Sequence, residues 1–182
     1  PSNEITIIII LYEEKEQLVL QCLKNIKDFK IIIVDNANNK ALKRQVEKNY
    51  KIFKYILNEK NYGYSKAANQ AIKLSNTEFI LMFQADGIID QKDIFKLLNA
   101  YKKYENCFIV SPTLYDKNQN LCANSGNFPE KYLYKTPMII DGDICTETVL
   151  GSIIMFKRED MIEIGLYDEN LFLYFLDDEL CK

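Results

Sequence analysis

Acidic and amide side chains stand at the ends of three apolar segments of the sequence. Carboxylate and amide oxygens bind hard divalent cations and accept hydrogen bonds from the N–H and O–H groups of a ligand. Each such residue could instead cap a helix or form an Asx turn. Their recurrence after three segments nevertheless favours a ligand site. In chain order these residues are Glu13, Asp35, Asn36, Gln84 and Asp86.

The stretch QADG, at residues 84–87, could hold a cation. Asp86 offers one or two oxygen ligands and the Gln84 amide a weaker one, which is too few for a cage made only of protein. Mg²⁺ and Mn²⁺ are commonly held by one or two carboxylates together with substrate phosphates and water. Gly87 would let the backbone approach a ligand closely, or supply a positive φ. The stretch predicts a cation shared with a substrate, with a simple turn as the alternative.

A second candidate element is the segment NEKNYGYSKAANQAI, at residues 58–72. Asn61 and Gly63 predict a turn, and the small residues that follow predict the start of a helix. The N–H groups at a helix amino terminus suit a phosphate, and Lys66 in the first turn is favourable only beside an anion. An exposed lysine on a tightly packed alanine-rich helix explains the segment equally well. Neither GxGxxG nor GxxxxGK[ST] is present, so a dinucleotide fingerprint or a P-loop is not supported.

Three acids, Asp177, Asp178 and Glu179, stand together near the end of the sequence, after an aromatic stretch. Neighbouring like charges raise one another's pKa, and a desolvated member of such a group can act as a general base. The alternative is a solvated acidic patch at the start of a helix.

The composition excludes several kinds of chemistry. The chain has no histidine, which rules out Ser–His and Cys–His nucleophiles and histidine-ligated metals. Its net charge of -3 argues against a nucleic-acid-binding surface. Five cysteines without a CxxC pair fit a reduced, cytosolic protein. No apolar run approaches the roughly 20 residues that span a bilayer, so we expect no transmembrane segment in this chain. We expect the protein in the cytoplasm or peripherally at the inner face of the membrane.

The pattern of the first 112 residues predicts the strands and helices that would position these side chains. Apolar, β-branched runs alternate with amphipathic segments, which is the pattern of a parallel sheet covered by helices. In the first helix, Leu18, Cys22, Leu23 and Ile26 share the expected inner face. We expect strands at residues 5–11, 30–34, 53–57, 78–83 and 107–112, and helices at 14–26, 40–50, 65–75 and 92–104.

After residue 113 the rhythm changes to irregular, polar sequence. A buried strand is expected at residues 148–156, and a short helix at 158–165 closed by Gly165. No repeat or linker indicates a second domain. We therefore expect one domain over residues 1–182, divided into halves at 1–112 and 113–182.

The order of these pieces resembles a known family. The chain reads LYEE after the first strand, then VDNANN, NYGYSKAANQAI, FQADG and IGLYDENLFLYFLDDELCK. This order resembles the family 2 glycosyltransferases with a GT-A fold, particularly their rhamnosyltransferase-like members, over nearly the whole chain. The resemblance implies an α/β fold with a mostly parallel, Rossmann-like sheet and a small irregular or antiparallel excursion. It also implies inverting transfer of a sugar from a nucleotide-diphosphate sugar to an acceptor hydroxyl, with Mg²⁺ or Mn²⁺.

The resemblance assigns residues 1–112 to the nucleotide-sugar donor. Asp35 matches a strand-end Asp that meets the base, and Glu13 lies in the loop beside it. Asp86 matches the last acid of a DxD-type motif, which holds the cation on the diphosphate. The implied donor-binding residues are Glu13, Asp35, Asn36, Asn61, Gly63, Lys66, Asn69 and Gln84, with Asp86 as the metal ligand.

Residues 113–182 are assigned by the same resemblance to the acceptor side. Asp177 matches the Asp of an ED pair and would be the catalytic base, with Asp178 beside it on the acceptor side. Gly151 and Ser152 lie where the acceptor-side strand approaches the sugar. The implied acceptor is a glycan or a lipid-linked glycan, in bacterial surface polysaccharide synthesis.

Three departures from the family pattern stand out. Gln84 occupies a position that is usually Asp or Asn, which predicts a lower metal affinity. Leu176 replaces the Glu of the ED pair. The sequence ends five residues after Asp177, where the family continues with a helix, so the resemblance implies a catalytic core with an incomplete acceptor-side half.

Three alternatives fit parts of the same pattern. A non-catalytic module that binds a nucleotide sugar would carry the same donor residues. A nucleotidyltransferase shares the architecture and the metal, but would carry a Gly-rich loop after the first strand, where this chain reads YEEKEQ. A flavodoxin-like regulatory domain is disfavoured by the long polar stretch after Leu114.

Overall fold

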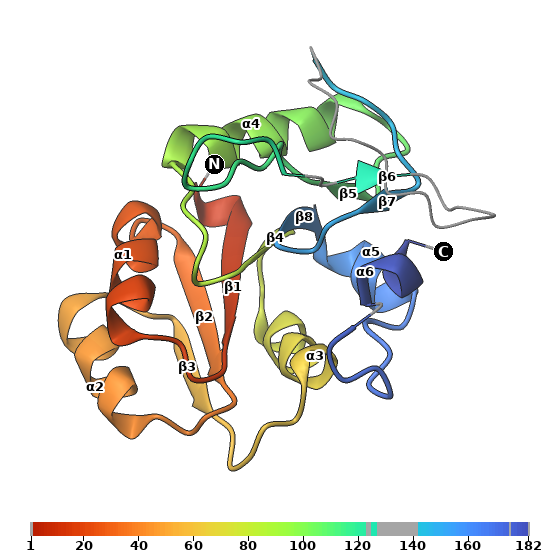
Figure 1. The fold of residues 1–182 in the computed structure, drawn as a ribbon. Helices are drawn as coiled ribbons and strands as arrows, with labels where there is room; N and C mark the ends of the chain where they lie inside the picture. The colour runs from red at the N-terminus through yellow and green to blue at the C-terminus, as the bar shows by residue number, and fades with distance from the viewer. Residues whose placement is uncertain (1, 123–124, 127–141, 175, 182) are drawn as a thin grey trace.

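A six-stranded sheet forms the centre of the molecule in the computed structural model, which describes residues 2–122, 125–126, 142–174 and 176–181 (Figure 1). The strands lie in the order β3-β2-β1-β4-β8-β5. The first four strands of the chain are mutually parallel, and β8 runs antiparallel to β4 and β5. The expected mostly parallel α/β sheet is therefore confirmed. The bounds are β1 Ile5–Leu11, β2 Lys30–Asp35, β3 Lys54–Leu57, β4 Phe79–Phe83, β5 Ile109–Val110 and β8 Ile153–Lys157.

The central strand β1 is apolar along its length because both of its faces are covered. Ile7 and Ile9 belong to one hydrophobic core, and Ile8 belongs to the core on the opposite face. Inner strands of parallel sheets are typically buried in this way. β1 pairs with β2 on one side and with β4 on the other, and Leu11 lies opposite Asp35 in the register.

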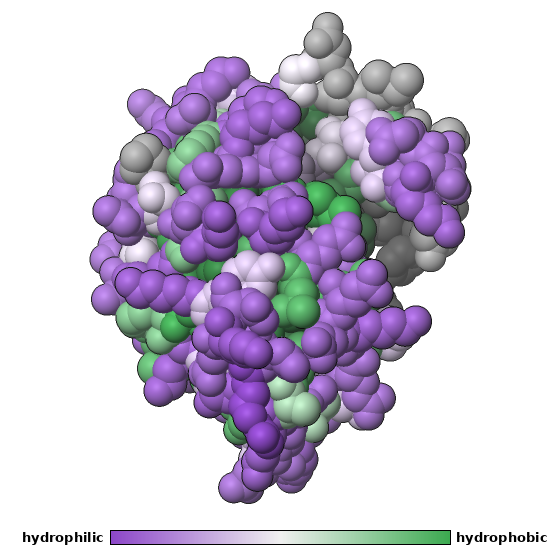
Figure 2. Space-filling model, turned by 90° about the vertical axis from the view of Figure 1, so that its left-hand side faces the viewer, coloured by the Kyte–Doolittle hydropathy of each residue, from purple (hydrophilic) through white to green (hydrophobic). Residues whose placement is uncertain are grey.

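Helices cover both faces of the sheet (Figure 1). Three of them, α1 Glu16–Ile26, α2 Lys40–Asn49 and α4 Gln91–Lys103, pack on the face that carries Ile7. Three others, α3 Tyr64–Leu74, α5 Arg158–Glu163 and α6 Leu176–Leu180, pack on the face that carries Ile8. The side of the molecule to which α1 and α2 belong is largely hydrophilic (Figure 2). A 3₁₀ turn, Ser2–Glu4, precedes β1. In the described parts of the chain, no helix is long and apolar enough to cross a membrane.

The expected inner face of the first helix was wrong at one position. Val19 joins Cys22, Leu23 and Ile26 in the core, whereas Leu18 is 38% exposed. At about 100° of turn per residue, the other three positions centre close to position 19, and position 18 lies roughly 90° away, at the edge of the stripe. The helix begins at Glu16, two residues later than expected.

The predicted strand at residues 148–156 proves to be two strands in different sheets. β7 Thr148–Val149 pairs with β6 Ser125–Gly126 in a small antiparallel sheet, and β8 begins after a turn at Gly151 and Ser152. The expected burial is confirmed for β8, whereas Leu150 is exposed, and the apolar run does not reveal where the chain changes direction. The strand expected at 107–112 is reduced to the two residues of β5, Ile109–Val110. The helix after β8 ends as predicted, with Gly165 at a positive φ of 97°.

The topology brings the candidate residues to one edge of the sheet. The carboxyl ends of the parallel strands β1, β2 and β4 meet there, and the antiparallel β8 begins there, because Ile153 pairs with Phe83. From β1 the chain steps outward to β2 and β3, then crosses to β4 on the other side of β1. Ligands of open α/β sheets bind at such a switch point, beyond the strand ends.

Candidate functional site

Two consecutive acids follow β1, and the structure places them differently. Glu13 is exposed, with a positive φ of 64°. Glu14 is half-buried, and its carboxylate accepts a hydrogen bond from the backbone N–H of Tyr12. Burial raises the pKa of Glu14, and the charges of Asp35 and Asp86 raise it further. Glu13 stays the predicted site residue of this loop; the sequence gives no reason to consider Glu14, because a loop has no periodicity that could separate two adjacent acids.

The Asp35 side chain is only 1% exposed at the end of β2. Its Oδ1 accepts a hydrogen bond from the Ala37 N–H at 2.8 Å, and its Oδ2 accepts one from the Tyr55 hydroxyl at 3.0 Å. Burial raises the pKa of Tyr55, and the neighbouring Asp35 charge raises it further. Both Asp35 oxygens therefore have protein donors, one of them in the Asx turn considered as the alternative.

Asn36 is also buried and engaged by the protein. Its Nδ2 donates to the carbonyl of Gly63 at 3.1 Å, and its Oδ1 accepts from Asn58 Nδ2 at 2.8 Å. These bonds tie the end of β2 to the loop before α3. Within that loop, Asn61 Oδ1 accepts from the Gly63 N–H at 2.9 Å, and Gly63 has a positive φ of 84°. The turn predicted at this point is confirmed.

The amino terminus of α3 is covered by the segment that precedes α6. The Tyr64 N–H donates to the carbonyl of Phe172 at 2.8 Å, and Ser65 Oγ donates to the carbonyl of Leu171 at 2.7 Å. The first N–H of the helix is thus already satisfied by the protein, and the phosphate contact considered for this terminus stays a prediction. Lys66 is exposed, with its ammonium 5.0 Å from the centre of the Tyr62 ring.

Asn69 joins α3 to the segment after α5. Its Oδ1 accepts from the Tyr167 N–H at 3.1 Å, while its Nδ2 donates to the Tyr167 carbonyl at 2.9 Å and to Glu169 Oε1 at 3.1 Å. The side chain is 3% exposed. Its amide groups therefore hold the protein together and are not presented to a ligand.

The QADG stretch forms a tight turn directly after β4. The Gly87 N–H donates to the carbonyl of Gln84 at 3.0 Å. Gln84 and Asp86 are exposed, whereas Ala85 between them is buried. The turn alternative is thus correct, and the turn itself presents Asp86 to solvent. The positive φ considered for Gly87 is wrong: a Cβ there would lie 2.9 Å from a ring carbon of Phe83, so close packing requires the glycine.

Two hydrogen bonds connect this turn to α6. The Gln84 N–H donates to the carbonyl of Ser152 at 3.1 Å. The next residue back, Gly151, donates its N–H to Asp177 Oδ2 at 2.8 Å. A Cβ on Gly151 would lie 2.0 Å from Asp177 Oδ1, so only glycine fits. The structure therefore joins residues predicted separately for the metal, acceptor and catalytic roles.

The α6 helix is held against the sheet by its apolar residues. Leu176 and Leu180 are both buried in the core that includes Ile8. Leu176, where the resembling family has Glu, thus anchors the helix that carries Asp177. The side chain of Asp178 lies outside what the structure describes, and Glu179 is exposed.

The oxygen ligands that the protein offers at this edge of the sheet fit a hard divalent cation. Asp86 and Gln84 present oxygen atoms to solvent, and such oxygens are what Mg²⁺ and Mn²⁺ prefer. Among the described residues, no three acidic or cysteine side chains come together as a metal cluster. A cation here would take Asp86 as its protein ligand and complete its coordination with water and phosphate.

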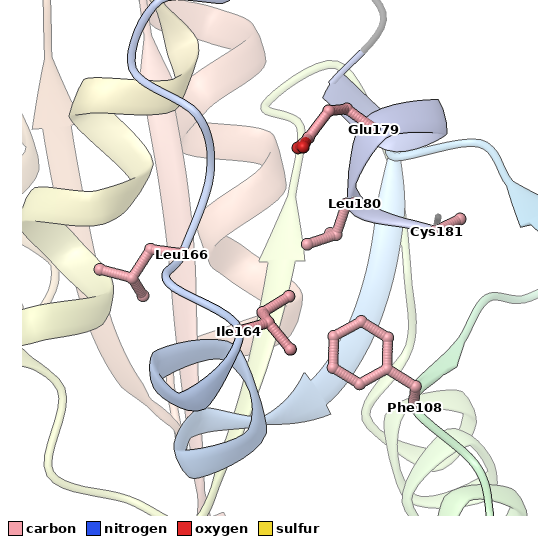
Figure 3. Close-up of a pocket in the computed structure, with 6 residues that line it drawn as sticks. All are labelled: Phe108, Ile164, Leu166, Glu179, Leu180 and Cys181. Atoms are coloured by element: carbon pink, nitrogen blue, oxygen red, sulfur yellow. The ribbon is translucent and has the colours of Figure 1, made fainter.

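An apolar hollow of about 370 Å³ lies elsewhere, beneath the end of α6 (Figure 3). None of the predicted site residues lines it. Apart from Glu179 it offers no charged group, so it does not belong to the candidate site. Its lining residues are Phe108, Ile164, Leu166, Glu179, Leu180 and Cys181.

Comparisons with known proteins identify the family of the chain. The sequence model of "Glycosyl transferase family 2" matches residues 6–165. The low-salt glycan biosynthesis hexosyltransferase Agl10 of Haloferax volcanii is 24% identical, over 98% of this chain and 61% of its own length. The dTDP-rhamnosyl transferase RfbF of Shigella flexneri is 27% identical, over 83% of this chain and 52% of its own length. The chain thus spans about half to three fifths of these curated relatives.

Solved structures share the fold. Mannosyltransferase PcManGT from Pyrobaculum calidifontis, in complex with GDP-Man and Mn²⁺, superposes with a TM-score of 0.66 at 16% identity, over 98% of this chain and 50% of that one. S. aureus TarS 1-349 in complex with UDP superposes with a TM-score of 0.65 at 17% identity, over 98% of this chain and 53% of that one. Together with the match over residues 6–165, these findings identify the chain as a member of glycosyltransferase family 2 with a GT-A fold.

Proposed function

We propose that the chain transfers a sugar from a nucleotide-diphosphate sugar to an acceptor hydroxyl, with inversion at the anomeric carbon. The family supports sugar transfer, and two relatives are named as a hexosyltransferase and a rhamnosyl transferase. Two structural neighbours were solved with GDP-Man and Mn²⁺ or with UDP, which supports a nucleotide donor and a divalent cation for this chain.

One observation carries the proposal: the hydrogen-bonded path from the QADG turn to Asp177. The carbonyl of Ser152 holds the turn that carries Asp86, and the N–H of Gly151 holds the Asp177 carboxylate. A donor whose diphosphate lies at Asp86 would therefore present its sugar toward the turn between β7 and β8, with Asp177 close by. An acceptor hydroxyl would enter between the sugar and Asp177.

The chemistry follows from these positions. The acceptor oxygen attacks the anomeric carbon while the bond from that carbon to the diphosphate oxygen breaks, and its electron pair leaves with the nucleoside diphosphate. Asp177 takes the proton of the acceptor hydroxyl, a role that contributes about 10²–10⁴-fold to a rate. The Gly151 N–H fixes the orientation of the carboxylate. Asp86 would hold a Mg²⁺ or Mn²⁺ ion, which would supply positive charge to the departing diphosphate.

The nucleotide would lie along the edge of the sheet from β2 to β4. Glu13, Lys66 and Gln84 are exposed and could contact it directly. The buried or internally bonded residues of the set would form its wall and floor, since their hydrogen bonds fix the loops around the site. These are Asp35, Asn36, Asn61, Gly63 and Asn69.

We propose that the acceptor is a molecule of glycan synthesis. Agl10 is named for glycan biosynthesis, and a third relative, 24% identical, is the poly-beta-1,6-N-acetyl-D-glucosamine synthase of Staphylococcus epidermidis. A glycan or lipid-linked glycan, handled in the cytoplasm or at the inner face of the membrane, fits these names.

The test is calorimetric titration of UDP, GDP and dTDP, and of their sugar conjugates, with and without Mn²⁺. We expect at least one of them to bind, and Mn²⁺ to tighten its binding. Absence of binding by all of them would overturn the proposal. Donor binding without any transfer to added glycans would instead favour a non-catalytic nucleotide-sugar-binding module.

A further inference from the structure

The segment between α5 and α6 carries three consecutive large apolar side chains that are exposed to solvent. Phe172 is 56% exposed, Leu173 52% and Tyr174 76%, and no large apolar side chain among those described is more exposed than Tyr174. The proposed mechanism gives these residues no role. Exposed apolar side chains that are contiguous commonly mark a place where a ligand or a partner binds.

Hydrogen bonds fix the backbone of this segment as far as Phe172. The Phe172 carbonyl accepts from the Tyr64 N–H at 2.8 Å, and the Leu171 carbonyl accepts from Ser65 Oγ at 2.7 Å. A Cβ on Gly63 would lie 2.7 Å from a ring carbon of Phe172, so this ring packs directly against the loop before α3. More than half of the Phe172 side chain nevertheless stays in contact with solvent.

The segment lies at the rim of the candidate site. It is bonded to the amino terminus of α3, which follows the carboxyl end of β3, and α3 and the segment lie side by side (Figure 1). The chain then enters α6, which begins at Leu176 and carries Asp177. Tyr174 stands three residues before Asp177, whose carboxylate accepts from the Gly151 N–H. An acceptor with its hydroxyl at Asp177 would therefore have this segment as a neighbour.

The chemistry of the segment fits a sugar ring. One side of a pyranose ring presents C–H groups, which pack against the negatively polarised face of an aromatic ring, while the hydroxyls at its rim stay in water. An anionic bilayer would instead be attracted by a basic surface. Two exposed lysines, Lys60 and Lys66, lie on the adjoining loop and helix, but Glu59, Asp168 and Glu169 are exposed in the same segments and outnumber them.

We propose that Phe172 and Tyr174 form a stacking platform for a sugar ring of the acceptor, so that the hydroxyl which receives the transferred sugar belongs to a glycan. This inference rests on the proposed function, because it requires an acceptor that binds beside Asp177.

The experiment measures binding of the methyl glycosides of glucose, N-acetylglucosamine and rhamnose by saturation-transfer-difference NMR, with donor nucleotide and Mn²⁺ present. At least one glycoside is expected to bind to the wild-type chain. Tyr174→Ala should raise its dissociation constant about tenfold, the size expected for burying about half of an aromatic side chain. Tyr174→Phe keeps the ring and should bind nearly as well as the wild type.

Phe53→Ala is the matched control for the loss of an exposed ring. Phe53 is 50% exposed and directly precedes β3, at the opposite edge of the sheet, so its replacement should leave glycoside binding unchanged. Because Tyr174 is exposed, Tyr174→Ala should keep its fold, and urea unfolding of the same samples checks this.

Four results would overturn the inference while leaving the proposed function intact. The first two are a chain that binds a donor nucleotide but no glycoside, and glycoside binding that is unchanged in Tyr174→Ala. The third is a loss confined to nucleotide sugars, which would place the donor's sugar on the platform. The fourth is binding to phosphatidylglycerol vesicles that Tyr174→Ala abolishes, which would make the segment a membrane contact. If the wild-type chain bound no nucleotide at all, the proposed function would fail together with the inference.

Discussion

The backbone N–H of Gly151 lies 2.8 Å from Oδ2 of Asp177, and the Gly151 Cα approaches that carboxylate so closely that a Cβ would lie 2.0 Å from its other oxygen. The turn between β7 and β8 thereby fixes both the direction of the carboxylate and its distance from the edge of the sheet. The same turn holds the QADG stretch through the Ser152 carbonyl. One short segment thus positions both the turn that carries Asp86 and the carboxylate of Asp177.

Gly151→Ala should displace the Asp177 carboxylate, since the new methyl group would occupy its place. We expect transfer to fall by about 10²-fold, the lower end of what a general base contributes. Donor affinity should change less than the transfer rate, because the exposed residues proposed to contact the nucleotide, Glu13, Lys66 and Gln84, lie on other segments. Steady-state kinetics and calorimetry measure the two quantities separately. Leu150→Ala is the control, as Leu150 is an exposed neighbour in the same segment, and equal losses in both variants would contradict a specific role for Gly151.

Asp86→Asn should remove the Mn²⁺-dependent part of donor binding, because an amide is a weaker ligand for a hard cation than a carboxylate. A loss of about tenfold or more in the presence of Mn²⁺ is expected, with little change in EDTA. Asp90→Asn serves as the comparison: Asp90 is also exposed, but its carboxylate lies 3.7 Å from Lys92 Nζ. If the two variants behaved alike in Mn²⁺, Asp86 would not be the ligand.

Tyr55→Phe should destabilise the fold by about 1–3 kcal/mol, because it deprives the buried Asp35 carboxylate of a hydrogen-bond donor. Urea unfolding measures this difference. Tyr50→Phe is a matched control, since the Tyr50 hydroxyl donates at 3.0 Å to an uncharged acceptor, the Leu20 carbonyl. Loss of the Tyr50 hydrogen bond should lower the free energy of unfolding by only about 0.5–1.5 kcal/mol. A smaller effect at Tyr55 than at Tyr50 would mean that Asp35 does not depend on this bond.

The stability of the chain should respond to pH through Glu14. Its pKa is raised in the folded state, so the folded chain binds this proton more tightly than the unfolded chain does. The ionised carboxylate therefore costs stability above its folded pKa, and this cost disappears as pH falls below the ordinary value of 4.5. Glu14→Gln should raise the free energy of unfolding relative to wild type at pH 7, and the gain should shrink toward pH 4. A pH-independent difference, or one that Glu13→Gln reproduces, would contradict this assignment.

The sheet and the QADG turn could be predicted because their signals are local. Consecutive isoleucines indicate the strand β1. The hydrogen bond between Gln84 and Gly87 closes a four-residue turn at the end of an apolar strand. Sequence order then placed Asp86 at the edge where ligands bind. Each of these conclusions requires only neighbouring residues and the known behaviour of parallel strands.

The contact between Gly151 and Asp177 could not be predicted from pattern, because 26 residues separate the two and their approach depends on how α6 packs. The apolar run at 148–156 concealed the turn that makes the contact. Asn36 and Asn69 looked like ligand contacts, yet their partners Gly63 and Tyr167 lie on distant segments that only the fold brings near. Pattern also could not tell which of Glu13 and Glu14 is the buried one, because burial in a loop is decided by tertiary packing.

The most direct test of the proposed mechanism is the transfer rate of Asp177→Asn, measured with the donor that binds best and with donor affinity determined on the same sample. The substitution keeps the size of the side chain and an oxygen for the Gly151 N–H, but removes the base. We expect transfer to fall by about 10²–10⁴-fold while donor affinity stays close to that of the wild type. Turnover near the wild-type rate would contradict it and move the role of the base to another acid, with Asp178 or Glu179 as the next candidates.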